Sequence, residues 1–195
     1  MGTTAVLVVD MQNVYLEGQK WACPSIASAA ANIRRVCRAM RGEGPIVLTR
    51  FMPAPDPAGV WRDYNRINAA VNADRWLNEL TDDMKALAEE VGAPVFDKPW
   101  YSAWKSEAVR AALADADAVA VAGVVADCCV LSTVFDLIDA GKYVVYLRDA
   151  VAGVSVETEE AAETVLRGLA YVHLRIETAE AFLRARRSGR CATSP

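Results

Sequence analysis

The chain has 195 residues, a length that favours a single domain. Hydrophobic residues make up 53% and charged residues 24%, a composition that supports a full buried core and argues against intrinsic disorder. The formal net charge of −4 and the lack of a long basic run argue against nucleic acid as a partner.

The first predicted elements are a buried strand and an amphipathic helix. Ala5–Val9 is a continuous apolar run, as expected for a strand covered on both faces. It is not preceded by the basic segment of a signal peptide, so we expect a first strand here. The next pattern, Pro24–Arg41, is typical of a helix. Its predicted buried face consists of Ile26, Ala29, Ala30, Ile33, Val36, Cys37 and Met40.

The rest of the chain continues the alternation of short strands and helices. The further predicted strands are Ile46–Thr49, Pro94–Phe96, Ala118–Ala122, Tyr143–Leu147 and Tyr171–Leu174. The further predicted helices are Ala103–Ala114, Cys128–Ala140 closed by Gly141, Glu157–Gly168 and Ala179–Arg186. This pattern predicts one α/β domain over residues 1–195, with a three-layer, doubly wound, six-stranded, mostly parallel, Rossmann-like sheet.

One connection is unusually long. The stretch from Phe51 to about Trp76 contains Pro53, Pro55 and Pro57, and we expect it to form a loop. Loops of this length in a compact domain usually serve a function, so we expect a substrate loop or an oligomer contact at about residues 51–76.

The cysteines and the single histidine limit the possible chemistry. The five cysteines are odd in number and two of them are adjacent, which argues against a disulfide framework and for a reducing compartment. With only His173 available, a zinc site of the Cys/His type is not expected. No uncharged stretch approaches the roughly 18 residues of a membrane span. We therefore expect a soluble, cytoplasmic protein with no membrane partner, no metal and no cofactor.

Three reactive side chains follow three predicted strands. Asp10 comes after the first strand, Lys98 after the third and the pair Cys128–Cys129 after the fourth. Ligands of open parallel sheets bind outside the carboxyl ends of the strands, so these groups are expected to meet. The helix start and the lysine would lower the thiol pKa, and Asp10 would act as acid and base. Backbone N–H groups there would form an oxyanion hole.

At these residues the sequence resembles the isochorismatase-like cysteine hydrolase family, which includes nicotinamidases and N-carbamoylsarcosine amidohydrolases. Three segments carry the resemblance: LVVDMQNVYLEG (Leu7–Gly18), DKPWYSAW (Asp97–Trp104) and GVVADCCVLSTVFDLIDAGKYVVYLRDAVAG (Gly123–Gly153). The resemblance extends from Ala5 to about Leu183.

The resemblance implies a role for each member of this set. Asp10 corresponds to the family's acid/base, Lys98 to its orienting charge and Cys129, which precedes Val130, to its nucleophile. It also implies a non-proline cis peptide bond before Val125, which would direct the Val125 N–H, beside that of Cys129, at the substrate oxygen.

The region after the second strand lacks the histidines of the nicotinamidase metal site, so neither a metal nor nicotinamide is expected. The main hypothesis is C–N hydrolysis of a small amide, ureido or lactam compound through a thioester. The alternatives are isochorismatase-type vinyl-ether hydrolysis with Asp10 as acid, and a binding subunit with a vestigial site.

Aromatic side chains near these strand ends are candidates for a substrate pocket, and their alternative role is core or subunit packing. The predicted substrate-binding residues are Gln12, Phe51, Trp61, Trp100, Tyr101 and Trp104. Arg50 or Arg62 would meet a substrate carboxylate. The expected partners are a small-molecule substrate and further copies of the chain, in a homodimer or homotetramer.

Overall fold

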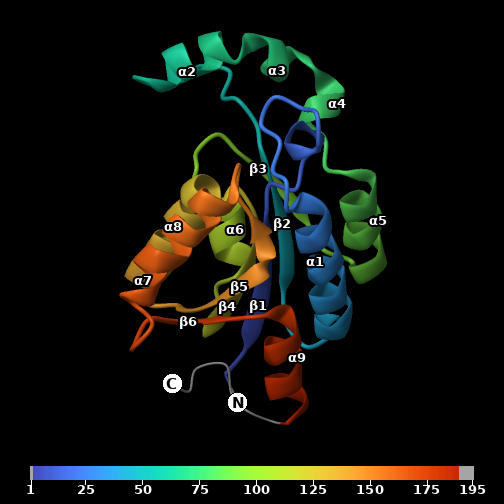
Figure 1. The fold of residues 1–195 in the computed structure, drawn as a ribbon, viewed down its shortest axis with the longest axis vertical. Coiled ribbons are helices and arrows are strands. Elements are labelled where there is room, and N and C mark those ends of the chain that lie inside the picture. Colours follow the sequence, from blue (N-terminus) through green and yellow to red (C-terminus); the bar gives the residue numbers. More distant parts are fainter. Residues whose placement is uncertain (1, 189–195) are drawn as a thin grey trace.

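A single six-stranded sheet forms the centre of the molecule (Figure 1). The computed structural model describes residues 2–188. The strands are β1 (Thr4–Val9), β2 (Ile46–Phe51), β3 (Val95–Lys98), β4 (Ala118–Val124), β5 (Tyr143–Ala152) and β6 (Leu174–Glu177). They lie in the order β3-β2-β1-β4-β5-β6, and each neighbouring pair is parallel. The predicted α/β class and doubly wound sheet are confirmed.

Helices cover both faces of the sheet. One layer contains α1 (Ile26–Met40), α5 (Asp82–Val91) and α9 (Ala179–Arg187), and the other contains α6 (Glu107–Ala112), α7 (Leu131–Asp139) and α8 (Val156–Arg167) (Figure 1). Each layer encloses its own apolar cluster with one face of the strands. In β1, Val6 and Val8 pack on the α1 side, whereas Ala5, Leu7 and Val9 pack on the α7 side. The predicted buried face of α1 is confirmed residue by residue.

The close fit between β1 and β4 depends on a glycine. A Cβ atom at Gly123 would lie 2.1 Å from the carbonyl oxygen of Val9. Gly123 also has a φ of +113°, a backbone conformation that residues with a side chain rarely adopt. The strand order reverses between β1 and β4, and this is where open α/β sheets bind their ligands. Gly123 therefore lets the ends of these two strands approach each other.

The predicted long loop at residues 51–76 is in large part helical. It contains α2 (Trp61–Ile67), α3 (Ala69–Ala73) and the start of α4 (Arg75–Asn78), which arch over the carboxyl ends of the strands (Figure 1). The prolines are confined to the irregular part before Gly59, and the following residues up to Pro94 contain none. The Asp74 side chain caps α4 by accepting from the Leu77 N–H at 3.1 Å.

Other elements also differ from the expectation. The helix α5 lies in a stretch to which the sequence pattern assigned no element, and it ends at Gly92 in a left-handed conformation. The predicted last strand, Tyr171–Leu174, is wrong by three residues, because the buried Leu174 begins β6 and pairs with Val144. His173 therefore precedes the strand and is exposed.

None of the helices in the described part of the chain combines the length and apolarity that crossing a bilayer requires.

Candidate active site

The Asp10 carboxylate and the Lys98 ammonium form an ion pair at the carboxyl edge of the sheet. Asp10 directly follows β1, Lys98 is the last residue of β3, and both side chains are completely buried. Lys98 Nζ donates to Asp10 Oδ2 at 2.5 Å and to the Trp100 carbonyl at 2.9 Å. Burial acts to lower the pKa of Lys98, but the interactions of the ammonium with Asp10 and Cys129 outweigh this effect and raise that pKa, so the lysine stays charged.

Thr49 holds the second oxygen of Asp10. It lies on β2, the strand between β1 and β3, and Thr49 Oγ1 donates to Asp10 Oδ1 at 2.7 Å. The Asp10 backbone N–H donates to the Thr49 carbonyl at 3.1 Å. Asp10 has φ of 51°, in the left-handed region that aspartate tolerates better than most residues. Thr49 was not among the predicted site residues, because its role depends on β2 lying between the two charged side chains.

Cys129 lies in a π-helical turn, Ala126–Val130, that links β4 to α7. The residue is only 3% exposed. Burial raises the pKa of the Cys129 thiol strongly, the Asp10 charge and hydrogen bond raise it further, and Lys98 lowers it. The predicted lowering of the thiol pKa is therefore wrong for this structure, because lost hydration outweighs the attraction of Lys98. The thiol is neutral at pH 7 and needs a base to become a nucleophile.

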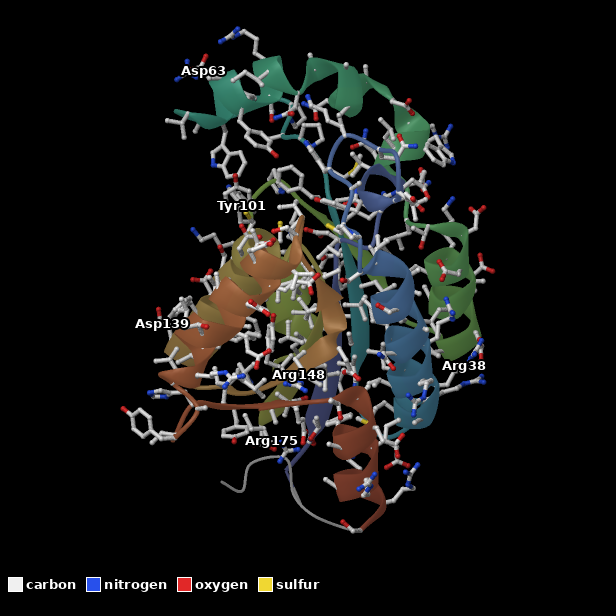
Figure 2. The ribbon with its side chains drawn as sticks, viewed as in Figure 1. Arg38, Asp63, Tyr101, Asp139, Arg148 and Arg175 are labelled. Atoms are coloured by element: carbon white, nitrogen blue, oxygen red, sulfur yellow. The ribbon has the colours of Figure 1, made fainter. Side chains whose placement is uncertain are left out.

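A cavity of about 210 Å³ opens beside Cys129. Half of the lining residues are aromatic: Tyr15, Trp21, Phe51, Tyr64 and Tyr101. The other lining residues are Val125, Asp127, Cys128, Cys129 and Val154. Figure 2 shows Tyr101 below α2, at the end of the molecule where the strands finish. Val125 and Cys129, whose N–H groups were predicted to form the oxyanion hole, thus border the same cavity.

Phe51 and Tyr101 are the two predicted substrate-binding residues that line this cavity. Trp61 does not line it, but packs against both, with ring centroids 6.0 Å from Phe51 and 5.0 Å from Tyr101. Trp61 therefore supports the aromatic wall from the side of α2.

The other three predicted substrate-binding residues lie elsewhere. The buried Gln12 amide is engaged with backbone: Nε2 donates to the carbonyls of Phe51 (3.1 Å) and Asn78 (2.8 Å), and Oε1 accepts from the Phe51 N–H (2.7 Å). Gln12 thus holds Phe51 in the cavity wall. Trp100 is exposed and offers its carbonyl to Lys98, and Trp104 packs into the apolar layer of α6, α7 and α8.

Three aromatic residues of the cavity were missed by the sequence reasoning. Tyr15 and Trp21 come from the turn after β1, and Tyr64 comes from α2 in the stretch expected to be a loop. The two segments meet in space, since the Trp21 and Tyr64 ring centroids are 6.5 Å apart. The available signal was the concentration of aromatic residues in the two segments that follow β1 and β2.

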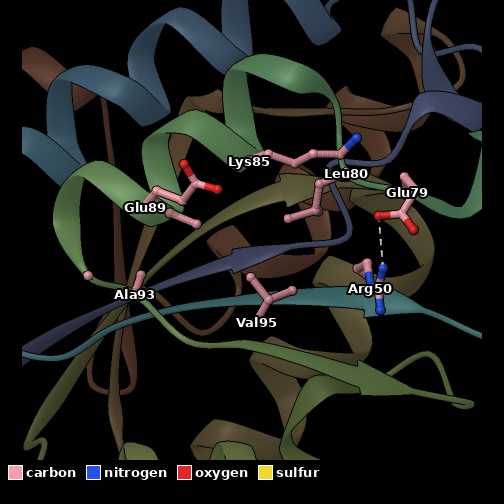
Figure 3. Close-up of a pocket in the computed structure, with 9 residues that line it drawn as sticks. Arg50, Glu79, Leu80, Lys85, Glu89, Ala93 and Val95 are labelled. Carbon is pink, nitrogen blue, oxygen red and sulfur yellow. Dashed lines mark hydrogen bonds and ion pairs between the residues drawn. The ribbon is translucent and has the colours of Figure 1, made fainter.

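A larger hollow of about 470 Å³ lies between α5 and the β2–β3 edge of the sheet (Figure 3). It contains Arg50, which was predicted to meet a substrate carboxylate. Arg50 is instead paired with Asp97 (2.8 Å) and Glu79 (3.1 Å), and Figure 3 shows it directed at Glu79. No cysteine lines this hollow in the described part of the chain. Arg62 lies on α2 and does not line the cavity beside Cys129 either.

The raised thiol pKa predicts slow alkylation of Cys129 by iodoacetamide. At pH 7 we expect a rate about ten-fold or more below that of an exposed cysteine, because only the thiolate reacts. Raising the pH increases the thiolate fraction, so the rate should still climb at pH 9. Asp10→Asn removes the negative charge that raises the pKa, and it should accelerate alkylation at pH 7.

Peptide mass spectrometry of Cys128→Ser and Cys128→Ser/Asp10→Asn proteins measures alkylation at Cys129 alone. Circular dichroism checks that both variants are folded. A rate that has already levelled off at pH 7 would contradict the argument from burial.

The model of the isochorismatase domain matches residues 4–177. The chain belongs to the isochorismatase family. No curated protein sequence matches it.

Solved structures of several hydrolases and related proteins share this fold. A cysteine hydrolase from Pseudomonas syringae pv. phaseolicola is 24% identical, with a TM-score of 0.81 over 95% of this chain and 93% of that one. An isochorismatase family protein from Desulfovibrio vulgaris is 18% identical, with a TM-score of 0.82 over 96% and 100% of the chains. A nicotinamidase/pyrazinamidase from Bacillus subtilis is 19% identical, with a TM-score of 0.73 over 88% and 98%.

Two features bear on the expectations drawn from the isochorismatase family. The peptide bond between Val124 and Val125 is cis, which the resemblance implied. Within residues 2–188, no three histidine, cysteine or acidic side chains are grouped so as to hold a metal ion.

Proposed function

We propose that this chain hydrolyses the C–N bond of a small non-peptide amide, ureide or lactam through a thioester on Cys129. One observation carries the proposal. A thiol that borders a small cavity interacts with the buried Asp10–Lys98 pair, and the three residues come from the ends of three different strands. Nucleophile, base and fixed charge are the parts that acyl transfer requires.

Acylation begins with the neutral thiol. Asp10 accepts the Cys129 proton as the sulfur attacks the substrate carbonyl carbon, which forms the C–S bond and places negative charge on the carbonyl oxygen. The N–H groups of Val125 and Cys129 stabilise this oxyanion. When the tetrahedral intermediate collapses, the C–N bond breaks and the leaving nitrogen takes the proton from Asp10.

Deacylation uses Asp10 a second time. It accepts a proton from a water molecule that attacks the thioester carbonyl, and it returns that proton to the Cys129 sulfur as the C–S bond breaks. The Lys98 ammonium lies 2.5 Å from the buried Asp10 carboxylate and supplies the counter-charge that this carboxylate needs away from water. Thr49 fixes the orientation of the carboxylate through its other oxygen.

The alternative chemistry within the family is vinyl-ether hydrolysis with Asp10 as acid. Cys129 has no role in that reaction, whereas the sulfur here borders the cavity and its pKa responds to both Asp10 and Lys98. This coupling favours acyl transfer. We further propose that the enzyme is cytoplasmic, that it needs no cofactor and that it works as a homodimer or homotetramer.

The direct test is a screen of small amides, ureides and lactams for release of ammonia or amine. We expect turnover of at least one member, and accumulation of an acyl adduct on Cys129 that mass spectrometry detects and hydroxylamine removes. Turnover without any adduct, and undiminished in Cys129→Ala, would contradict the thioester.

A further inference from the structure

The aromatic wall of the cavity forms a corner of perpendicular rings. The Tyr64 ring stands at 88° to Phe51 and at 89° to Tyr101, with centroids 6.0 and 6.5 Å apart. Trp21 adjoins Phe51 and Tyr64, each at 6.5 Å. The faces of such rings carry partial negative charge and attract cations within about 6 Å, with energies of ~0.5–2 kcal/mol.

No positively charged side chain lines this cavity in the part of the chain that the structure describes. The Lys98 ammonium lies 5.3 Å from the Phe51 ring centroid, but it is fully buried and donates to Asp10 and the Trp100 carbonyl. Arg50 is held by Asp97 and Glu79 in the separate hollow. A substrate carboxylate in this cavity would therefore lose its hydration without gaining a cationic partner.

The one charged residue in the lining is an acid. Asp127 is exposed at the start of the π-helical turn, two residues before Cys129. Within residues 2–188 no hydrogen bond or ion pair engages its carboxylate. Burial raises the pKa of the Cys128 thiol, and the Asp127 charge raises it further. The field of Asp127 therefore reaches the cavity that Cys128 borders. An unpaired carboxylate beside aromatic faces is a combination that attracts a cation.

We propose that the substrate is an amide whose non-reacting part is cationic, a quaternary or protonated amine, and that Asp127 determines this specificity. The inference rests on the proposed amide hydrolysis at Cys129. The cavity volume of about 210 Å³ is below the roughly 300–1,000 Å³ of drug-sized sites, so the cationic group is small, of the size of a trimethylammonium.

Three amides of the same length test the proposal. Betaine amide carries trimethylammonium, 3,3-dimethylbutanamide carries the neutral tert-butyl group of the same shape, and malonamate carries a carboxylate. We expect kcat/KM for the cationic amide to exceed that for the neutral one by about ten-fold. The anionic amide should be the poorest by about a hundred-fold or more, because its desolvation is uncompensated.

Asp127→Asn isolates the contribution of the acid. We expect it to reduce the cationic-to-neutral ratio of kcat/KM by about three- to ten-fold, mainly through KM for the cationic amide. The matched control is Asp139→Asn, an exposed acid at the far end of α7 from Tyr101 (Figure 2), and it should leave the ratio unchanged. Preference for the neutral or anionic amide, or an unchanged ratio in Asp127→Asn, would overturn the proposal.

A second measurement does not depend on turnover, so it separates this proposal from the proposed hydrolysis. Two methanethiosulfonates, one with a trimethylammonium and one with a sulfonate group, react with Cys129 in a Cys128→Ser background. The rate of each reagent with Cys129 is divided by the rate of the same reagent with 2-mercaptoethanol, which corrects for the different intrinsic reactivity of the two reagents. The cationic reagent should be favoured about ten-fold or more, and Asp127→Asn should reduce that factor. Equal normalised rates would refute the charge selectivity of the cavity. Unequal rates without any amide turnover would support the charge selectivity but refute amide hydrolysis.

Discussion

Replacing Cys129 by alanine should abolish amide hydrolysis, lowering kcat/KM by at least about 10⁴-fold. In the proposed mechanism the sulfur forms the bond that replaces the scissile C–N bond, so no other group can take over its step. The Asp10–Lys98 pair does not depend on the thiol for its 2.5 Å contact, and we expect the variant to stay folded. The measurement is amine release at saturating and at low substrate, together with urea unfolding to check the fold.

Two other cysteine variants make this result specific. Cys37 is as buried as Cys129 but lies on α1 in the opposite layer, so Cys37→Ala should leave kcat/KM unchanged. Cys128 borders the cavity, and Cys128→Ser should cost no more than about ten-fold. If Cys128→Ser were inactive and Cys129→Ala active, the roles of the two adjacent thiols would be exchanged. A fully active Cys129→Ala enzyme would instead point to acid catalysis by Asp10.

Breaking the buried ion pair should cause the largest loss of stability of any substitution at the site. Lys98→Met leaves the Asp10 carboxylate buried without a counter-charge, a situation that costs about 3–5 kcal/mol. Asp10→Asn likewise leaves the Lys98 ammonium buried without a counter-charge. The double variant removes both charges, so its loss of stability should be smaller than the sum of the single losses by ~2 kcal/mol or more.

Urea unfolding of the four proteins measures this coupling from the midpoints and slopes. Lys105→Met is the matched control, because Lys105 is an exposed lysine in the segment that follows β3. This substitution should change the free energy of unfolding by no more than ~0.5 kcal/mol. All three site variants should be inactive whatever their stability, since each lacks the proposed base or its counter-charge. Additive losses in the double variant would show that the two charges do not depend on each other.

The central elements of the fold could be predicted because burial leaves a strong local pattern. A run such as Ala5–Val9 is apolar on both faces only if helices cover both faces of its sheet, and α1 repeats its apolar residues at helical spacing. The helical stretch 61–78 was hidden because three prolines stand just before it and because it is divided at Asn68 and Asp74 into three short helices.

The chain by itself determined that Asp10, Lys98 and Cys129 stand at or beside strand ends, because the order of strands and helices follows from local patterns. Parallel strands then bring those ends to one edge. Only the tertiary structure decided which aromatic side chains surround the Cys129 sulfur and whether the Cys129 thiol is neutral. Tyr15, Tyr64 and Asp127 face one cavity through segments far apart in sequence, and the thiol pKa depends on how completely those segments exclude water. Desolvation and charge are properties of the packed molecule, and no local pattern encodes them.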